Sequence, residues 1–323
     1  MNKGFLKFII NILIFLVVIW IIFFIIVRNF PMNIFDEEYA AYKQTMDYIK
    51  DSDEYNRVLV FGDSVSKAAI CPTLISDSMY NLSMAGGTPI EQYYIFKEYL
   101  EHHEAPKTVV MMYFMGGYTS VDDFFWNRTV YFNCLSQKQF NEILDTDLFP
   151  NPVLARIKFF EYKTCMPHRY FAAVKNGLFS NRKDVNEEVY NDSVETKGQH
   201  YFGLETEYAP NNTTINKQNE FEPLPIIDFY LNKNIELCLE NNIQVIIEQH
   251  PINISTFNNM KDKFKTEYRD YMNRIEAKHP GVIVNKEFDI KPDDWFGDFS
   301  HLNPNGAKHF TYELNDKYLQ YFN

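Results

Sequence analysis

Residues Phe8 to Val27 form an apolar run that only Asn11 interrupts. A run of this length matches an α-helix that crosses the ~30 Å hydrocarbon core of a bilayer. A secretory signal sequence normally has a shorter apolar region and a small-residue cleavage site, whereas this run ends in VRNFP. We therefore expect residues 1–30 to form a short cytoplasmic tip and an uncleaved transmembrane anchor.

Charges at the two ends of this run indicate its orientation. Lys3 and Lys7 precede it and Arg28 follows it, a small excess that favours a cytoplasmic N-terminus. The prediction is a single-pass protein of the cell membrane whose main domain is extracytoplasmic. The whole chain has 31 Lys and Arg against 43 Asp and Glu, and this acidic balance argues against nucleic acid as a partner.

Beyond residue 56, short apolar runs alternate with longer amphipathic ones. Strands are expected at Val58–Phe61, Met79–Met84, Thr108–Phe114, Gln244–Glu248 and Val282–Asn285, and helices at Ile90–His103, Asp228–Asn241, Asn258–His279 and Asn305–Tyr321. This alternation predicts an α/β fold, a three-layer α/β/α sandwich with a mostly parallel sheet. Residues 31–56 would be a connector, helical from Asp36 to Asp53.

The domain over residues 57–323 loses this rhythm at about 120–225, where the chain is rich in aromatic residues and Asn. This stretch is interpreted as an insertion that forms a lid or a partner surface. Irregular helices that only complete the core would fit the same pattern. The four cysteines are widely spaced and form no C-x-x-C pair, so neither a zinc knuckle nor a redox dithiol is expected, and disulfide pairing stays open.

The first predicted strand ends directly in Gly62-Asp63-Ser64. A serine in such a turn has the placement of a nucleophile, because the turn lifts its hydroxyl above the sheet beside the N–H groups of the next helix. The G-x-S-x-G elbow is absent, since residues 62–66 read GDSVS. A serine nucleophile needs a histidine and an orienting carboxylate, and Asp298 and His301 lie three residues apart near the C-terminus. Each motif alone is an ordinary turn or helix start, but together they predict a catalytic triad.

Three stretches, VLVFGDSVS, YNLSMAGGTPIE and DFSHLNPNGA, resemble the sequence blocks of the SGNH (GDSL-like) hydrolase superfamily. The resemblance runs from about Arg57 to the C-terminus and leaves the middle uncovered. It implies an SGNH or flavodoxin-like fold in which Ser64 is the nucleophile, His301 the general base and Asp298 its orienting acid. It also implies an oxyanion hole made by the N–H groups of Ser64 and Gly86.

The third block departs from that family. There the hydrolases carry Gly-x-Asn-Asp, whose asparagine donates to the oxyanion hole, whereas Met112 to Tyr118 read MYFMGGY. In this respect the chain resembles the membrane-anchored SGNH-like proteins of lipoteichoic-acid D-alanylation and polysaccharide O-acetylation. That resemblance implies a polytopic membrane-bound O-acyltransferase as partner and a cell-surface polysaccharide or related polymer as substrate.

Four further residues are candidates for substrate binding: Asp63, Gly87, His250 and Trp295. His250 ends a predicted strand at the edge where parallel sheets place their sites, although a satisfied structural histidine is the favoured interpretation. Trp295 lies three residues before Asp298, and Trp126, Tyr118 and Phe296 are further candidate pocket walls, although packing is the commoner use of aromatic residues. Neither a metal nor a cofactor is expected.

These observations favour an extracytoplasmic O-acyltransferase that passes an acyl group, most simply acetyl, from Ser64 to a hydroxyl of the polymer. If water replaced that acceptor, the same triad would run an SGNH esterase or deacylase. The missing asparagine supports a third alternative, a non-catalytic, membrane-tethered accessory protein that binds glycan.

Overall fold

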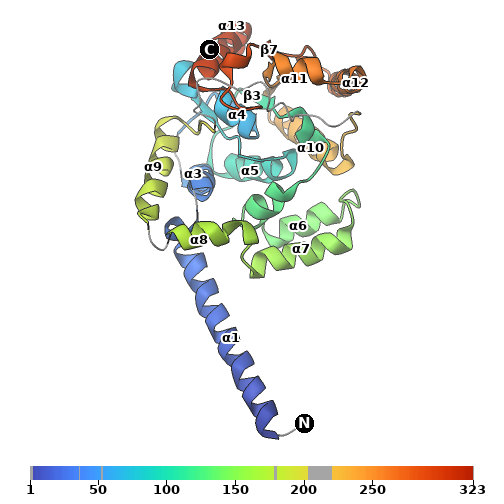
Figure 1. Cartoon of the computed structure of the whole chain (residues 1–323). Coiled ribbons are helices and arrows are strands. Elements are labelled where there is room, and N and C mark those ends of the chain that lie inside the picture. The colour runs from blue at the N-terminus through green and yellow to red at the C-terminus, as the bar shows by residue number, and fades with distance from the viewer. Residues whose placement is uncertain (1–2, 36, 52–53, 178–179, 203–219, 323) are drawn as a thin grey trace.

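The computed structural model describes residues 3–35, 37–51, 54–177, 180–202 and 220–322. Its first element, α1 (Lys3–Asn29), projects as a single helix away from the rest of the chain (Figure 1). By length and composition α1 could cross a membrane, a test that a signal sequence near the N-terminus would also pass. The apolar run at the N-terminus is therefore one continuous helix, as expected.

The main sheet has five parallel strands in the order β2-β1-β3-β4-β6. The strands are β1 (Val58–Gly62), β2 (Met79–Asn81), β3 (Thr108–Met112), β4 (Gln244–Ile247) and β6 (Ile283–Val284). This is the flavodoxin-like order, in which the chain reverses direction across the sheet between β1 and β3. All five expected strands are present, and the prediction of an α/β fold is confirmed.

Successive residues of β1 face opposite layers of helices. Leu59 and Phe61 pack into the core formed with α5 (Pro89–His102), α10 (Pro225–Glu240) and α12 (Asp262–Lys278). Val58 and Val60 pack into the second core, formed with α4 (Ser64–Ala69) and α13 (Pro304–Phe322). Because both faces are covered, these strands are continuous apolar runs rather than alternating ones.

Two local features differ from the expected pattern. The helix predicted over Asn258–His279 begins only at Asp262, as α12, and a separate short helix, α11 (Ile254–Asn259), precedes it. Met260 and Lys261, between the two helices, have extended backbone angles. A second small parallel sheet pairs β5 (Ile252–Asn253) with β7 (Ile290–Lys291). Strands of two residues are too short to show any periodicity in a sequence.

The connector contains α2 (Pro31–Ile34) and α3 (Glu37–Asp51), so its expected helix is present. In the described part of the 120–225 stretch, the regular elements are helices joined by turns and irregular segments. It contains the π-helix η3 (Phe125–Val130), α6 (Gln137–Leu144), α7 (Pro152–Thr164), the short 3₁₀ helix η4 (His168–Tyr170), α8 (Phe171–Gly177) and α9 (Arg182–Glu195). Of these elements, α7 and α8 lie at the pole of the domain from which α1 projects (Figure 1). The other 3₁₀ helices among the described residues are η1 (Pro72–Leu74), η2 (Met115–Tyr118) and η6 (Asp293–Trp295).

Candidate active site

Asp63 fixes the turn between β1 and α4. Its Oδ1 accepts a hydrogen bond from the Val65 N–H at 3.0 Å, and its Oδ2 accepts one from the Phe114 N–H at 2.8 Å. One buried carboxyl group therefore caps α4 and joins it to the end of β3. Ser64 is the first residue of α4, so its N–H has no acceptor within the helix.

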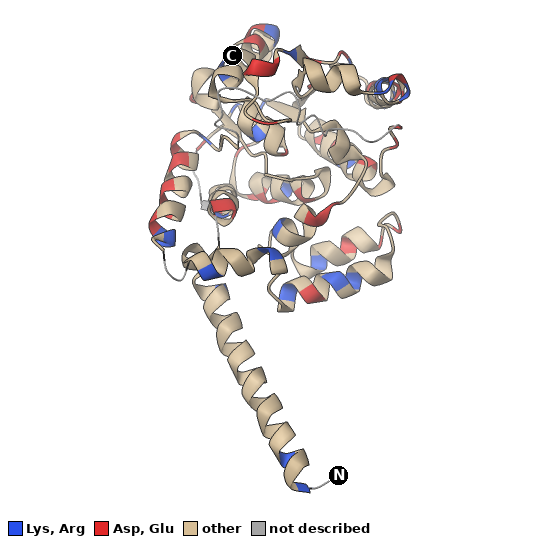
Figure 2. Cartoon of the chain, in the orientation of Figure 1, with Lys and Arg blue, Asp and Glu red and all other residues tan. Residues whose placement is uncertain are grey.

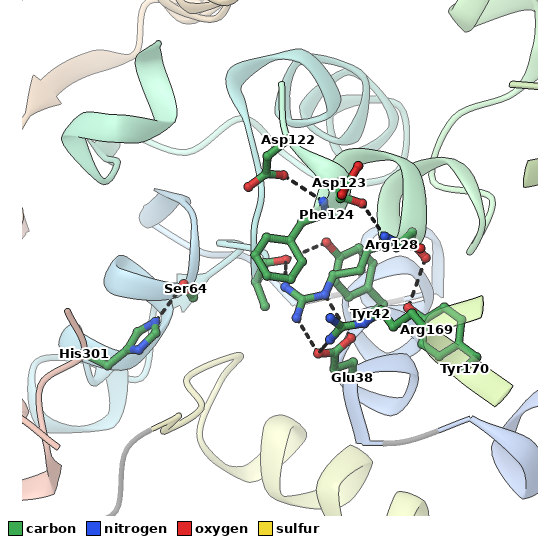
Figure 3. A network of polar contacts seen from close by, with 12 residues as sticks. Glu38, Tyr42, Ser64, Asp122, Asp123, Phe124, Arg128, Arg169, Tyr170 and His301 are labelled. Carbon is green, nitrogen blue, oxygen red and sulfur yellow. Dashed lines mark hydrogen bonds and ion pairs between the residues drawn. The ribbon is translucent and has the colours of Figure 1, made fainter. Parts of the chain in front are cut away.

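Ser64, His301 and Asp298 form one hydrogen-bonded chain. His301 Nε2 lies 2.8 Å from Ser64 Oγ, and His301 Nδ1 lies 2.7 Å from Asp298 Oδ2 (Figure 3 shows Ser64 and His301). The second carboxylate oxygen, Oδ1, accepts from the backbone N–H groups of Ser300 and His301, both at 2.8 Å. With the proton on Nδ1, the imidazole donates to Asp298 and its free Nε2 can take the hydroxyl proton of Ser64.

Asp298, which bonds to His301, and Asp63, which precedes Ser64, differ in their electrostatic environment. Burial raises the pKa of Asp298, but the hydrogen bond and charge of His301 outweigh it, so the net shift lowers the pKa. Asp298 is therefore a carboxylate at neutral pH and can stabilise a protonated His301. Burial raises the pKa of Asp63 to about 6, although the N–H groups of Phe114 and Val65 oppose that shift. With both oxygens engaged by backbone donors, Asp63 positions the turn.

Gly86 approaches other groups too closely to carry a side chain. Its φ angle is 69°, and a methyl group there would lie 2.7 Å from Phe124 Cβ and 2.9 Å from Arg128 Nη1. The preceding carbonyl, that of Ala85, accepts from Tyr42 Oη at 2.8 Å and from Arg128 Nη1 at 2.9 Å. That carbonyl and the Gly86 N–H belong to one planar trans peptide, so the two donors also fix the direction of the N–H.

An ion-pair network supports Arg128 in this place (Figure 3). Glu38 of α3 accepts from Arg128 Nε at 3.0 Å and also pairs with Arg128 Nη2 and with Arg169 Nη2. The Arg128 guanidinium lies 4.1 Å from the centre of the Phe124 ring, and that of Arg169 lies 5.4 Å from it. The network therefore links α3 to the peptide between Ala85 and Gly86.

A pocket with a volume of about 700 Å³ opens onto Ser64 and His301. Four aromatic residues contribute to its lining: Phe114, Phe124, Phe202 and Phe299. The polar lining includes Thr88, Asp122 and Arg128. A pocket of this size and mixed lining is typical of sites for small organic groups.

The loop after β3 contributes glycines to this pocket. Met115 to Tyr118 form η2, from which Gly116 and Gly117 line the pocket. The described lining contains no asparagine. The predicted oxyanion donors, the N–H groups of Ser64 and Gly86, belong to residues that line this pocket.

Two of the four predicted substrate-binding residues line the pocket and two do not. Asp63 and Gly87 line the pocket, whereas His250 and Trp295 lie outside its described lining. His250 is buried, its ring centre is 5.3 Å from that of Phe114, and burial lowers its pKa to about 3. The Trp295 ring stacks on His309 at 5.0 Å.

The aromatic pocket walls differ from those expected. Trp126, Tyr118 and Phe296 are buried in the hydrophobic cores, and the phenylalanines named above line the pocket instead. The sequence does not predict the contacts that Arg128 and Tyr42 make at this site. Neither belongs to a recognisable motif, because their contacts to Ala85 each span 43 residues of chain.

No known protein-family model matches the chain, and no curated protein matches it in sequence. Among solved structures it is similar to one described as "The structure of a putative platelet activating factor from Streptococcus pneumonia". That similarity has a TM-score of 0.37 and 12% sequence identity, and it covers 87% of this chain and 92% of the other.

Proposed function

We propose that this protein is a serine-dependent acyl-transfer enzyme of the SGNH type. The observation that carries the proposal is the hydrogen-bonded chain from Asp298 through His301 to Ser64, which opens into the pocket. A structural role alone would not require a serine, an imidazole and a carboxylate in this order at the mouth of a pocket.

The geometry supports a two-step reaction. Ser64 Oγ attacks the carbonyl carbon of an acyl donor while its proton passes to His301 Nε2, and Asp298 stabilises the resulting imidazolium. The N–H groups of Ser64 and Gly86 stabilise the oxyanion until the leaving group departs with the proton from His301. In the second step His301 removes the proton from an acceptor hydroxyl as its oxygen attacks the acyl-serine. The bond from the acyl carbon to Ser64 Oγ then breaks, and His301 returns the proton to Oγ.

For the acceptor we propose a hydroxyl group of a cell-surface polysaccharide or related polymer, with acetyl as the simplest acyl group. Support comes from α1, which is long and apolar enough to anchor the domain at a membrane, and from the resemblance to membrane-anchored SGNH-like proteins. A single span cannot move an acyl group across a bilayer. We therefore propose a polytopic membrane-bound O-acyltransferase as the donor-side partner and an extracytoplasmic location for the domain.

An esterase or deacylase is the second candidate, because Ser64 is partly exposed in a pocket that water can enter. Water would then replace the polymer hydroxyl in the second step. The first step, and the roles of Ser64, His301 and Asp298, would be unchanged.

Ester-linked acyl groups on the isolated surface polymer distinguish these functions in cells that carry Ser64→Ala. A transferase predicts loss of the ester, and a deacylase predicts more ester than in wild type. An accessory protein without catalysis predicts an unchanged amount, which would refute the proposal. Ser78→Ala is the matched control, since it removes a partly buried turn hydroxyl next to β2 and should leave the ester content unchanged.

A further inference from the structure

Helix α7 presents apolar side chains on its outer face. Val153, Ile157 and Phe160 are 71%, 59% and 70% exposed. Their spacing of four and three residues places them on one side of the helix, while Ala155 and Phe159 are buried on the other side against the domain. A helix on the surface of a soluble domain normally carries polar residues on its outer face, so this apolar stripe indicates contact with a further apolar surface.

The last turn of α7 lies beside the last turn of α1. Arg28 donates from Nη2 to the Lys163 carbonyl at 3.0 Å and from Nη1 to the Tyr131 carbonyl at 3.2 Å. Val27, the preceding residue, is only 2% exposed. The apolar helix is thus fixed to the domain at its C-terminal end. Helix α7 ends at that junction and lies along the same pole of the domain (Figure 1).

Two aromatic residues extend the apolar surface around this junction. Phe30 directly follows α1, Phe171 begins α8, and both side chains are exposed. Phenylalanine, like tryptophan and leucine, is typical of the apolar face of helices that lie in the interfacial region of a bilayer. We define the membrane-facing surface as Phe30, Val153, Ile157, Phe160 and Phe171.

The charge of this region is opposite to that of the whole chain. The chain has a net charge of −12, whereas residues 152–177 contain a single acidic residue, Glu161, and five basic ones: Arg156, Lys158, Lys163, Arg169 and Lys175. Figure 2 shows blue segments on α7 and α8 and many red segments over the rest of the domain. Basic side chains around an apolar face are typical of helices that lie in the interface of a bilayer with anionic lipids.

We propose that α7 and the start of α8 lie on the bilayer that α1 crosses, with the membrane-facing surface inserted at the boundary between headgroups and acyl chains. A lipid surface fits better than a protein partner, because the apolar residues continue directly from the end of α1 and form an exposed stripe rather than a pocket. Contact at α1, α7 and α8 together would hold the Ser64 pocket at a fixed height and tilt above the membrane. The proposal is independent of the chemistry at Ser64.

The test uses the full-length chain with Cys165→Ser, which removes the one exposed native thiol, and with Ile157→Cys as the attachment site for a fluorophore. The labelled protein is reconstituted into vesicles of phosphatidylglycerol and phosphatidylethanolamine that contain no other protein. We expect lipids that carry a nitroxide near the headgroup to quench the label at Ile157. Aqueous iodide, added on both sides of the bilayer, should quench it several-fold more weakly than it quenches the control label at Leu319. Leu319→Cys, on α13, is the matched control because Leu319 is also apolar and 49% exposed, and its label should respond to iodide alone.

Two results would overturn the proposal. One is a label at Ile157 that iodide quenches as strongly as the label at Leu319. The other is protection that is absent in the lipid vesicles and appears only in native membranes, because a membrane protein rather than lipid would then cover the stripe. Phe160→Cys repeats the measurement one turn further along α7, so a local effect of one substitution cannot decide the outcome.

Discussion

Gly86→Ala should separate the stability of the fold from the chemistry of the site. Gly86 has a φ angle of 69°, and an alanine in the left-handed region costs roughly 1–2 kcal/mol of stability. The added methyl group would also meet Phe124 Cβ at 2.7 Å and Arg128 Nη1 at 2.9 Å. The backbone at residue 86 must therefore move, and the N–H that would stabilise the oxyanion moves with it.

Loss of one oxyanion donor typically slows the chemical step about 10²–10³-fold. We expect a reduction of that size in the rate at which Gly86→Ala is acylated by an aryl acetate, measured as the initial burst of released phenol. Gly281→Ala is the matched control. Gly281 also has a positive φ angle, 96°, but no heavy atom lies within 4 Å of a methyl group placed there.

Both variants should lose stability from the positive φ angle, and Gly86→Ala should lose more because its methyl group also meets Phe124 and Arg128, which thermal unfolding in detergent measures. Only Gly86→Ala should lose acylation. If the two folded variants were acylated at the same rate, the assignment of the Gly86 N–H to the oxyanion hole would be wrong.

Three further predictions follow from the same structure. Asp298→Asn should slow acylation by about 10³–10⁴-fold, because an amide at this position no longer holds the His301 tautomer, whereas the exposed Asp294→Asn should not; equal rates would contradict the triad. Burial raises the pKa of Glu91 from 4.5 to about 7, so the stability from its neutral form is complete below pH 4.5 and is lost as pH rises through about 7. The melting temperature of Glu91→Gln minus that of wild type should therefore increase between pH 5 and pH 8. A difference that does not change with pH would contradict that pKa. The protein should stay with membranes during an alkaline carbonate wash, and release of a form shortened by about 30 residues would show cleavage instead.

The sequence pattern predicts the sheet because its strands are covered on both faces. Each of β1, β3 and β4 is a short run dominated by apolar residues, bounded by polar or turn residues, and such runs are visible without any knowledge of tertiary contacts. The break between α11 and α12 is not visible in the same way. Residues 254–278 carry no proline or glycine, so the extended backbone at Met260 and Lys261 depends on packing rather than on local propensity.

In the candidate site, too, the residues in local motifs could be predicted, and those placed by long-range contacts could not. Ser64 and the pair Asp298 and His301 stand in short motifs whose chemistry can be read locally, and the structure brings them together across 237 residues of chain. Arg128 could not be identified in this way, because its contacts with Glu38 and Ala85 bridge 90 and 43 residues. Its place beside Gly86 depends on the ion pair between Arg128 of η3 and Glu38 of α3, which no local pattern in the sequence predicts.

The most direct test of the acyl-serine proposal is covalent labelling with a fluorophosphonate, which reacts with activated serines. The proposal predicts one probe per full-length chain, located on Ser64 by mass spectrometry of the digested protein. Labelling should be absent in Ser64→Ala and slowed by several orders of magnitude in His301→Ala. A folded wild-type protein that stays unlabelled, or equal labelling of Ser64→Ala, would contradict it.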